Sequence, residues 1–224
     1  LSLIEGMFSF VYYDSLKEKV FVAKDKFGQK PLFICRFGQE LILSSSILSI
    51  RNLKPNITVD KDSIFTYLFT QGHIEPEKTF FENIQSLQAG HYGVFEKNKN
   101  QFERYFAVEN VVGNKYRRFS EEDLIREGSE ILSKSVKEHL NADCKVGNLL
   151  SGGIDSTLIK YFIEENFKNH TSFMKYSEDI EDIPNTFLNH YSGKRSNIII
   201  SYPSKKKYLD KLFEYISFGG RPAP

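Results

Sequence analysis

The sequence lacks the features that mark several large classes of protein. Its 224 residues include only two cysteines, Cys35 and Cys144, too few for a disulfide framework or a cysteine-rich metal site. No segment reaches the ~18 apolar residues of a membrane-spanning helix. The formal net charge is +1, so we expect no bulk attraction to nucleic acid or to an anionic membrane surface. These absences favour a protein of the reducing cytoplasm that binds neither nucleic acid nor membrane.

The composition is that of an ordinary globular chain. Apolar residues make up 40% of the sequence and charged residues 26%, both close to the averages for folded domains. The length allows one large domain or two small ones, each with its own core. The chain opens on Leu1 within an alternating apolar segment and ends on Gly-Gly-Arg-Pro-Ala-Pro. We therefore expect it to be part of a longer protein.

The first half of the chain, to about residue 112, predicts a β-rich domain. Aromatic and β-branched residues recur with a period of two, as is typical of strands. Turn residues separate these segments into hairpins, and the expected strands are 6–13, 19–23, 32–36, 41–45, 91–96 and 101–106. A helical turn is expected at 47–50. A helix is expected at 60–71, with Asp60 as its N-cap and a stripe of Ile64, Tyr67 and Leu68.

The second half predicts an α/β domain. Residues 108–119 lose periodicity and gain charge, so we expect the domains to be 1–112 and 119–224. Ser120 and Asp123 have the spacing of a capping box at the start of a long helix, whose buried face would carry Leu124, Ile125, Ile131, Leu132, Val136 and Leu140. Strands are expected at 145–150, 171–176 and 196–201, and helices at 155–167, 184–191 and 205–217. Such alternation implies a parallel sheet.

The most informative segment is the glycine turn between the first strand and the first helix of that sheet. It reads Ser151, Gly152, Gly153, Ile154, Asp155 and Ser156. Backbone N–H groups at a helix N-terminus bind anions, above all phosphate. Asp155 would repel a phosphate unless a divalent cation lay between them, and Mg²⁺ prefers one or two carboxylates plus phosphate oxygens. It is not a Walker loop, because no Gly-Lys-Ser/Thr follows a glycine at the required distance. The alternative is an ordinary turn with helix-capping serines.

Four segments in order extend this interpretation to nearly the whole chain. EGMFSFVYYD, VFVAKDKFGQKPLF and TFFENIQSLQAGHY precede the SGGxDS loop. Together they resemble the glutamine-hydrolysing asparagine synthetases. The resemblance implies a fold that is α/β plus α+β. The C-terminal part of an antiparallel-sheet αββα amidotransferase domain would come first, followed by the first half of a parallel-sheet, adenine-nucleotide alpha-hydrolase-like synthetase domain.

The resemblance also implies a reaction and roles for particular residues. In that family glutamine is hydrolysed by an N-terminal cysteine, which would lie upstream of Leu1, so no catalytic residue is expected in this chain. ATP with Mg²⁺ then activates the aspartate carboxylate as an adenylate, which ammonia attacks. The nucleotide-binding residues would be Leu150, Ser151, Gly152, Gly153, Asp155, Ser156 and Lys175, with Asp155 as the Mg²⁺ ligand. A homodimer is a further possibility.

Some departures from the family pattern leave alternatives open. The family's Ser-Glu-Ile-Lys segment reads Ser45, Ser46, Ile47 and Leu48 here, so its acidic and basic residues are absent. The carboxylate could then be aspartate or a related acid. Other interpretations are a β-lactam synthetase-like or biosynthetic-cluster amidotransferase, a non-catalytic nucleotide-binding homologue, and a tRNA-modifying enzyme, against which the lack of a basic face argues.

Several remaining polar residues are expected to be structural. Cys35 lies within a predicted strand, and Cys144 directly precedes another, so both should be core residues. His91 enters a strand from a turn and should form a structural hydrogen bond. Asp25 and Lys30 lie in a polar loop that needs anchors of this kind, although both could instead face a route for ammonia.

Overall fold

The computed structural model describes residues 1, 3–97, 99–111, 119–167, 170–175 and 198–201, together with Lys206 and Lys211. The chain divides into two compact units. The described residues up to 111, with Lys211, belong to the first unit, and the described residues from 119 to 206 belong to the second. The helix expected at 184–191 lies outside the described residues. Of the helix expected at 205–217, only Lys206 and Lys211 are described, and both are helical.

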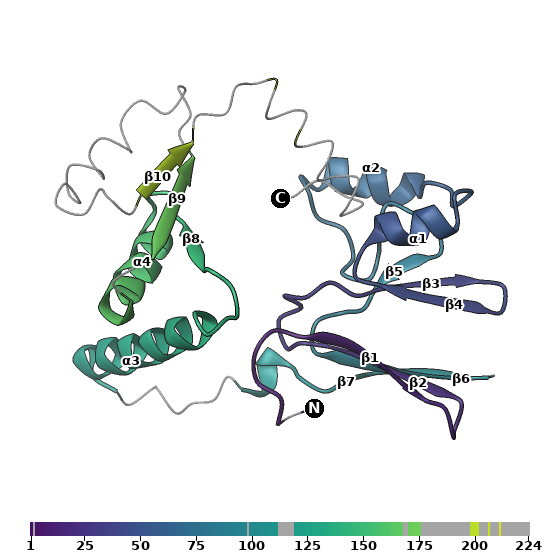
Figure 1. The fold of residues 1–224 in the computed structure, drawn as a ribbon, viewed down its shortest axis with the longest axis horizontal. Helices are drawn as coiled ribbons and strands as arrows, with labels where there is room; N and C mark the ends of the chain where they lie inside the picture. The colour runs from purple at the N-terminus through teal and green to yellow at the C-terminus, as the bar shows by residue number, and fades with distance from the viewer. Residues whose placement is uncertain are drawn as a thin grey trace. The chain divides into compact units, whose positions relative to one another are not determined.

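The first unit contains two antiparallel sheets (Figure 1). One has the strand order β1-β2-β6-β7, formed by Ser9–Asp14, Lys19–Lys24, His91–Glu96 and Lys99–Arg104. The predicted hairpins β1-β2 and β6-β7 are confirmed. The other sheet has the order β4-β3-β5, formed by Glu40–Ser44, Phe33–Phe37 and Ile84–Ser86. The three-residue strand β5 was not predicted, because so short a segment carries little periodicity.

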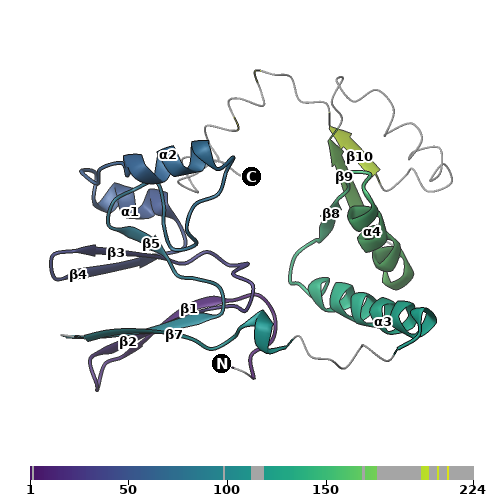
Figure 2. The same ribbon diagram turned by 180° about the vertical axis from the view of Figure 1, so that it is seen from behind.

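Two helices accompany the second sheet. Helix α1 covers Ile47–Leu53 and α2 covers Lys61–Phe69, and both views place them on the side of this sheet that faces away from the first (Figures 1 and 2). Asp60 caps α2 as predicted, since its side chain accepts hydrogen bonds from the N–H groups of Asp62 and Ser63. The predicted stripe is wrong in part, because Leu68 is 71% exposed. A short 3-10 helix, η1, covers Val108–Asn110.

Strand β3 supplies two separate cores because its side chains alternate between the faces of the sheet. Ile34 belongs to the cluster formed with both sheets, whose buried members are Val22, Leu32, Ile34, Leu87 and Phe95. Cys35 belongs to the cluster shared with α1, whose buried members are Cys35, Ile47, Ile50, Ile57 and Ile84. The side chain of Cys35 is fully buried, as predicted. In the described residues the first unit is thus layered as sheet, sheet and helices.

The second unit is built on a parallel sheet, as predicted. Its elements are α3 (Glu121–His139), β8 (Gly147–Leu149), α4 (Ile154–Asn166), β9 (Thr171–Lys175) and β10 (Ile198–Ser201). The strand order is β10-β9-β8, and both pairings are parallel. The capping prediction for α3 is confirmed, since the Ser120 hydroxyl accepts a hydrogen bond from the Asp123 N–H.

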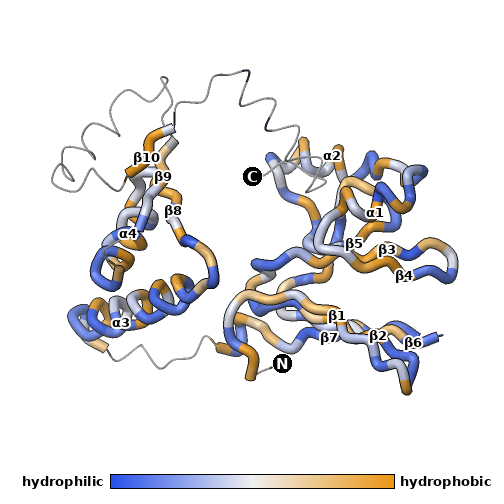
Figure 3. Tube along the Cα trace, in the orientation of Figure 1, coloured by the Kyte–Doolittle hydropathy of each residue, from blue (hydrophilic) through white to orange (hydrophobic). Residues whose placement is uncertain are grey.

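Of the predictions about burial in this unit, the one for α3 is wrong in part and the one for Cys144 is wrong. The apolar residues of α3 recur between hydrophilic ones (Figure 3), yet the exposed fractions of Leu124, Ile125, Ile131 and Leu132 run from 41% to 63%. A periodic pattern shows which face can be buried, but burial also needs a partner for that face, and α3 packs against α4. Cys144 is exposed because β8 begins only at Gly147. No helix in the described part of the chain is long and apolar enough to cross a membrane.

Candidate functional site

The candidate site begins where β8 ends. Leu150 follows the strand, is 2% exposed, and donates its N–H to the carbonyl of Phe173 on β9 at 2.8 Å. This bond continues the pairing of the two parallel strands by one residue. The chain therefore leaves the sheet at a fixed point, and the glycine loop follows directly. Ligands of parallel sheets bind at this end of the strands.

The loop itself is short and turns sharply. Gly152 has a φ of +84°, a backbone conformation that residues with a side chain rarely adopt. Gly153 is the N-cap of α4, and no side chain caps the helix there. The first N–H groups of a helix lack acceptors within the helix. In the described structure, the N–H groups at the start of this 13-residue helix thus keep their capacity to bind an anion.

The two serines of the loop bond to each other. The Ser156 hydroxyl lies 3.0 Å from that of Ser151 and accepts a hydrogen bond from the Ser151 N–H at 3.2 Å. It donates in turn to the carbonyl of Gly153 at 3.2 Å. The Ser151 hydroxyl accepts from the Gly153 N–H, with a longer separation of 3.4 Å. The ends of the loop are thereby joined, and two of its N–H groups are satisfied by hydroxyl oxygens.

Asp155 lies in the first turn of α4 and is exposed. In the described residues its carboxylate has no hydrogen-bond or ion-pair partner. No group of three His, Cys, Asp or Glu side chains gathers in the described part of the chain to hold a metal ion. Mg²⁺ needs no such group when phosphate oxygens complete its coordination. The free carboxylate beside the loop therefore fits a Mg²⁺ ion that is bound together with a nucleotide.

The other sequence-predicted residue of the site is Lys175, the last residue of β9. It pairs in register with Ser201 of β10 and follows Phe173, the partner of Leu150, by two residues. The backbone of Lys175 is thus at the same edge of the sheet as the loop. The sequence alone does not indicate Phe173, whose carbonyl accepts the hydrogen bond from the Leu150 N–H. Only the register of β8 against β9 brings these two residues together.

In the first unit the polar loop after β2 has a structural anchor. Asp25 is 1% exposed, and its carboxylate accepts hydrogen bonds from the N–H groups of Phe27, Gln29 and Lys30 at 3.0–3.1 Å. Burial by itself raises the pKa of Asp25, but the hydrogen bonds from the backbone outweigh this and leave the pKa below its usual value. His91 forms a hydrogen bond with the carbonyl of Ala89. The structural roles predicted for Asp25 and His91 are confirmed, and Lys30 is exposed.

Comparison with known proteins gives the order of domains that the sequence predicts. A glutamine amidotransferase domain model matches residues 1–106, and an asparagine synthase model matches residues 127–186. The chain is 36% identical to "Asparagine synthetase [glutamine-hydrolyzing] 2" of Bacillus subtilis, over 75% of this chain and 24% of the relative. It is 29% identical to a putative asparagine synthetase of Methanocaldococcus jannaschii, over 69% of this chain and 30% of the relative.

A relative with another name matches at a similar level. "Amidase chry2" of Gibberella zeae is 29% identical over 79% of this chain and 27% of the relative. The chain spans between about a quarter and a third of the length of these curated relatives.

Proposed function

Because the chain belongs to the family of glutamine-hydrolysing asparagine synthetases, we propose that its whole protein is an ATP-dependent amide ligase. Glutamine supplies ammonia, and ATP activates the side-chain carboxylate of aspartate as an acyl-adenylate with release of pyrophosphate. Ammonia then attacks the activated carbonyl, and AMP leaves with its bonding electron pair. The observation that carries this proposal is the uncapped start of α4 behind the SGGxDS loop, in a chain of this family.

The roles of the loop residues follow from their atoms. The N–H groups of the loop, Gly152 and Gly153 among them, and the hydroxyls of Ser151 and Ser156 would hold the phosphates that leave as pyrophosphate. Such donors act chiefly by orienting the phosphates and stabilising their charge. Asp155 would hold Mg²⁺, which when bound neutralises part of the phosphate charge. Leu150 and the backbone of Lys175 would border the nucleotide at the edge of the sheet.

A second candidate is the amidation of another carboxylate. One feature favours it: the acidic and basic residues of the family pattern are absent from the segment from Ser45 to Leu48. Both candidates use the same phosphate loop. They differ in the acid that is activated, and the assay must therefore vary that acid.

The test measures pyrophosphate release by the whole protein with ATP, Mg²⁺ and glutamine, across a panel of carboxylic acids. Release that depends on aspartate, with asparagine formed, supports the first candidate, and release with another acid supports the second. We expect Asp155→Asn to lower pyrophosphate release about a hundredfold or more, since metal ions stabilise such transition states by several kcal/mol. Glutamine hydrolysis should stay intact.

The control variant is Asp143→Asn, which removes an exposed carboxylate from the segment between α3 and β8. It should leave both activities unchanged. Pyrophosphate release by Asp155→Asn at the rate of the unaltered protein would show that Asp155 is not the metal ligand. No release with any acid would contradict the proposed ligase activity as a whole.

A further inference from the structure

A pocket of about 190 Å³ lies within the first unit. It is bordered by both sheets, and its lining residues come from β3, β5, β6, β7 and the segments beside β5. These residues are Ile34, Glu77, Gln85, Ser86, Leu87, Gln88, His91 and Phe102. Neither the proposed reaction nor the fold of the unit assigns a role to this pocket.

One part of the pocket wall is apolar. Ile34 and Leu87 are core residues of the first unit. Phe102 pairs across the strands with Gly93, and a Cβ atom at Gly93 would lie 2.8 Å from the Phe102 ring, so the ring lies over the glycine. An apolar cavity of roughly 150 Å³ holds a benzene molecule. The pocket is therefore large enough for an apolar group of about that size with one polar substituent.

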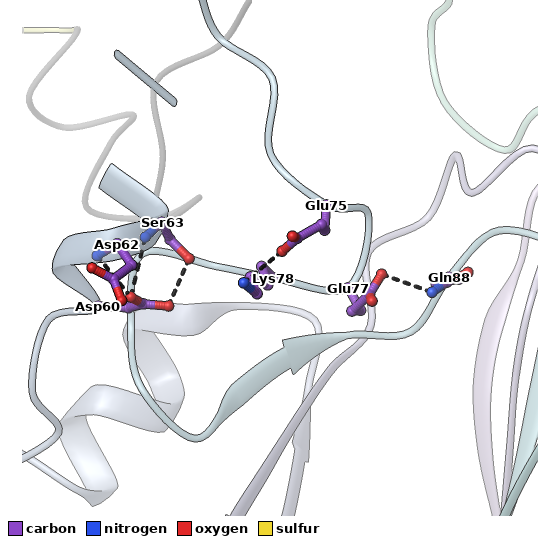
Figure 4. A network of polar contacts seen from close by, with 7 residues as sticks. All are labelled: Asp60, Asp62, Ser63, Glu75, Glu77, Lys78 and Gln88. Carbon is purple, nitrogen blue, oxygen red and sulfur yellow. Dashed lines mark hydrogen bonds and ion pairs between the residues drawn. The ribbon is translucent and has the colours of Figure 1, made fainter. Parts of the chain in front are cut away.

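Three polar residues of the wall, Glu77, Gln88 and His91, can accept hydrogen bonds. Gln88 donates its side-chain N–H to the Glu77 carboxylate at 2.8 Å (Figure 4), which leaves the Gln88 carbonyl oxygen and the second Glu77 oxygen able to accept. The Nδ1 atom of His91 lies 2.8 Å from the Ala89 carbonyl. Because a carbonyl only accepts, this nitrogen carries the proton, and in the neutral ring Nε2 is an acceptor.

The formal charge among the lining residues is negative. Glu77 is an acidic residue, and no lysine or arginine is among the lining residues in the described structure. The buried Lys24 lies outside the lining, with its Nζ 3.5 Å from the Ser86 hydroxyl. The Glu77 carboxylate thus favours an ammonium group beside it, although the backbone N–H of Ser86 donates to the Glu77 carbonyl at 2.8 Å and places the two residues side by side.

From this combination we propose that the pocket is a binding site for a small organic ammonium ion. The ammonium group donates hydrogen bonds to Glu77, Gln88 and His91, which together match its donor-only chemistry. The apolar body of the ion lies against Ile34, Leu87 and the face of Phe102, where a nearby cation also gains from the aromatic ring. This site does not depend on the ligase activity proposed above.

The test uses three probes that share a phenyl ring, are of similar size and differ in charge: benzylammonium, benzyl alcohol and benzoate. Their binding to the whole chain is measured by calorimetry, and the site is located by shifts of the backbone NMR signals of Ser86 and Gln88. We expect benzylammonium to bind at least about tenfold more tightly than the other two, since a charge-assisted hydrogen bond is worth about a factor of ten or more.

Variants separate this site from a general effect of charge. Glu77→Gln should weaken benzylammonium binding by about tenfold or more and leave that of benzyl alcohol unchanged. Glu75→Gln is the matched control, because Glu75 forms an exposed ion pair with Lys78 and does not line the pocket, and it should bind benzylammonium as the unaltered chain does. Equal binding of the three probes, no binding of benzylammonium, or equal losses in both variants would each overturn the proposal.

Discussion

Replacing Asp25 tests whether one buried carboxylate holds the loop after β2. Its Oδ1 accepts from the N–H groups of Phe27 and Gln29, and its Oδ2 accepts from that of Lys30. A hydrogen bond to a charged group contributes about 1.5–3 kcal/mol. The three donor residues are exposed, so water can replace part of what is lost. We therefore expect Asp25→Ala to lower the free energy of unfolding by about 3 kcal/mol, roughly 1 kcal/mol for each bond.

Asp25→Asn should cost less, because the amide can keep its oxygen at the position of Oδ1. The bonds from Phe27 and Gln29 would remain, and only the Lys30 N–H would lose its acceptor, at a cost of about 1–2 kcal/mol including the lost charge. Asp14→Asn is the control. Asp14 also accepts two loop N–H groups, at 3.1 Å, but its side chain is 26% exposed, so its replacement should cost about 1 kcal/mol or less.

The pH dependence of the same variants has a defined sign. The pKa of Asp25 is lowered in the folded chain, since the hydrogen bonds to Gln29, Lys30 and Phe27 outweigh the effect of burial. A carboxyl group whose pKa is lower in the folded state stabilises it above the unfolded pKa of about 3.9 and ceases to do so as the pH falls through the folded pKa. The stability difference between the unaltered chain and Asp25→Asn should be constant near neutrality and shrink below about pH 4.

The assay is urea unfolding followed by circular dichroism, with amide hydrogen exchange as the local measurement. Because the chain has two units, exchange of the Phe27, Gln29 and Lys30 amides assigns the change to the first unit. We expect these three amides to exchange faster in Asp25→Ala, and in Asp25→Asn chiefly that of Lys30. Unchanged exchange at all three, with a loss of stability below about 0.5 kcal/mol, would refute the anchoring role of Asp25.

Two further predictions concern the same unit. Gly90 and Gly38 have similar φ angles of +65° and +62°, but a Cβ atom at Gly90 would lie 2.7 Å from the Phe106 carbonyl oxygen and one at Gly38 would meet nothing. In urea unfolding, Gly38→Ala should therefore cost about 1–2 kcal/mol and Gly90→Ala clearly more, and equal costs would refute the clash. Ile50→Ala should cost about 2–5 kcal/mol, because Ile50 is fully buried. Leu53→Ala on the same helix should cost under about 0.5 kcal/mol, since Leu53 is 67% exposed.

Local signals in the sequence predicted local structure well. The hairpins β1-β2 and β6-β7 and the N-caps Asp60 and Ser120 depend on residues within a few positions of one another. Predictions that needed a distant partner were less reliable. Four residues of the predicted apolar face of α3 are exposed in the described structure, and Cys144 is exposed in the segment before β8. Neither a periodic pattern nor a neighbouring strand specifies what packs against a residue.

The candidate sites differ in the same way. The SGGxDS loop was recognisable because its six residues are consecutive and all but Ile154 have a chemical role in the proposed function. The ammonium pocket was not, since Ile34, Glu77, Gln88 and Phe102 come from four segments that only the pairing of strands brings together. Each of these residues taken alone is typical of a strand or an exposed loop.

In the proposed function, a nucleotide would change the bonding of the SGGxDS loop when it binds. The Ser151 N–H is already bonded to the Ser156 hydroxyl, and the Gly153 N–H to that of Ser151. A phosphate oxygen can replace each hydroxyl oxygen as acceptor, and the hydroxyls then become free to donate to the phosphate. The number of hydrogen bonds within the loop falls while the number to the ligand rises. If the loop binds phosphate as proposed, an exchange of acceptors would be enough, with no need for a change of fold.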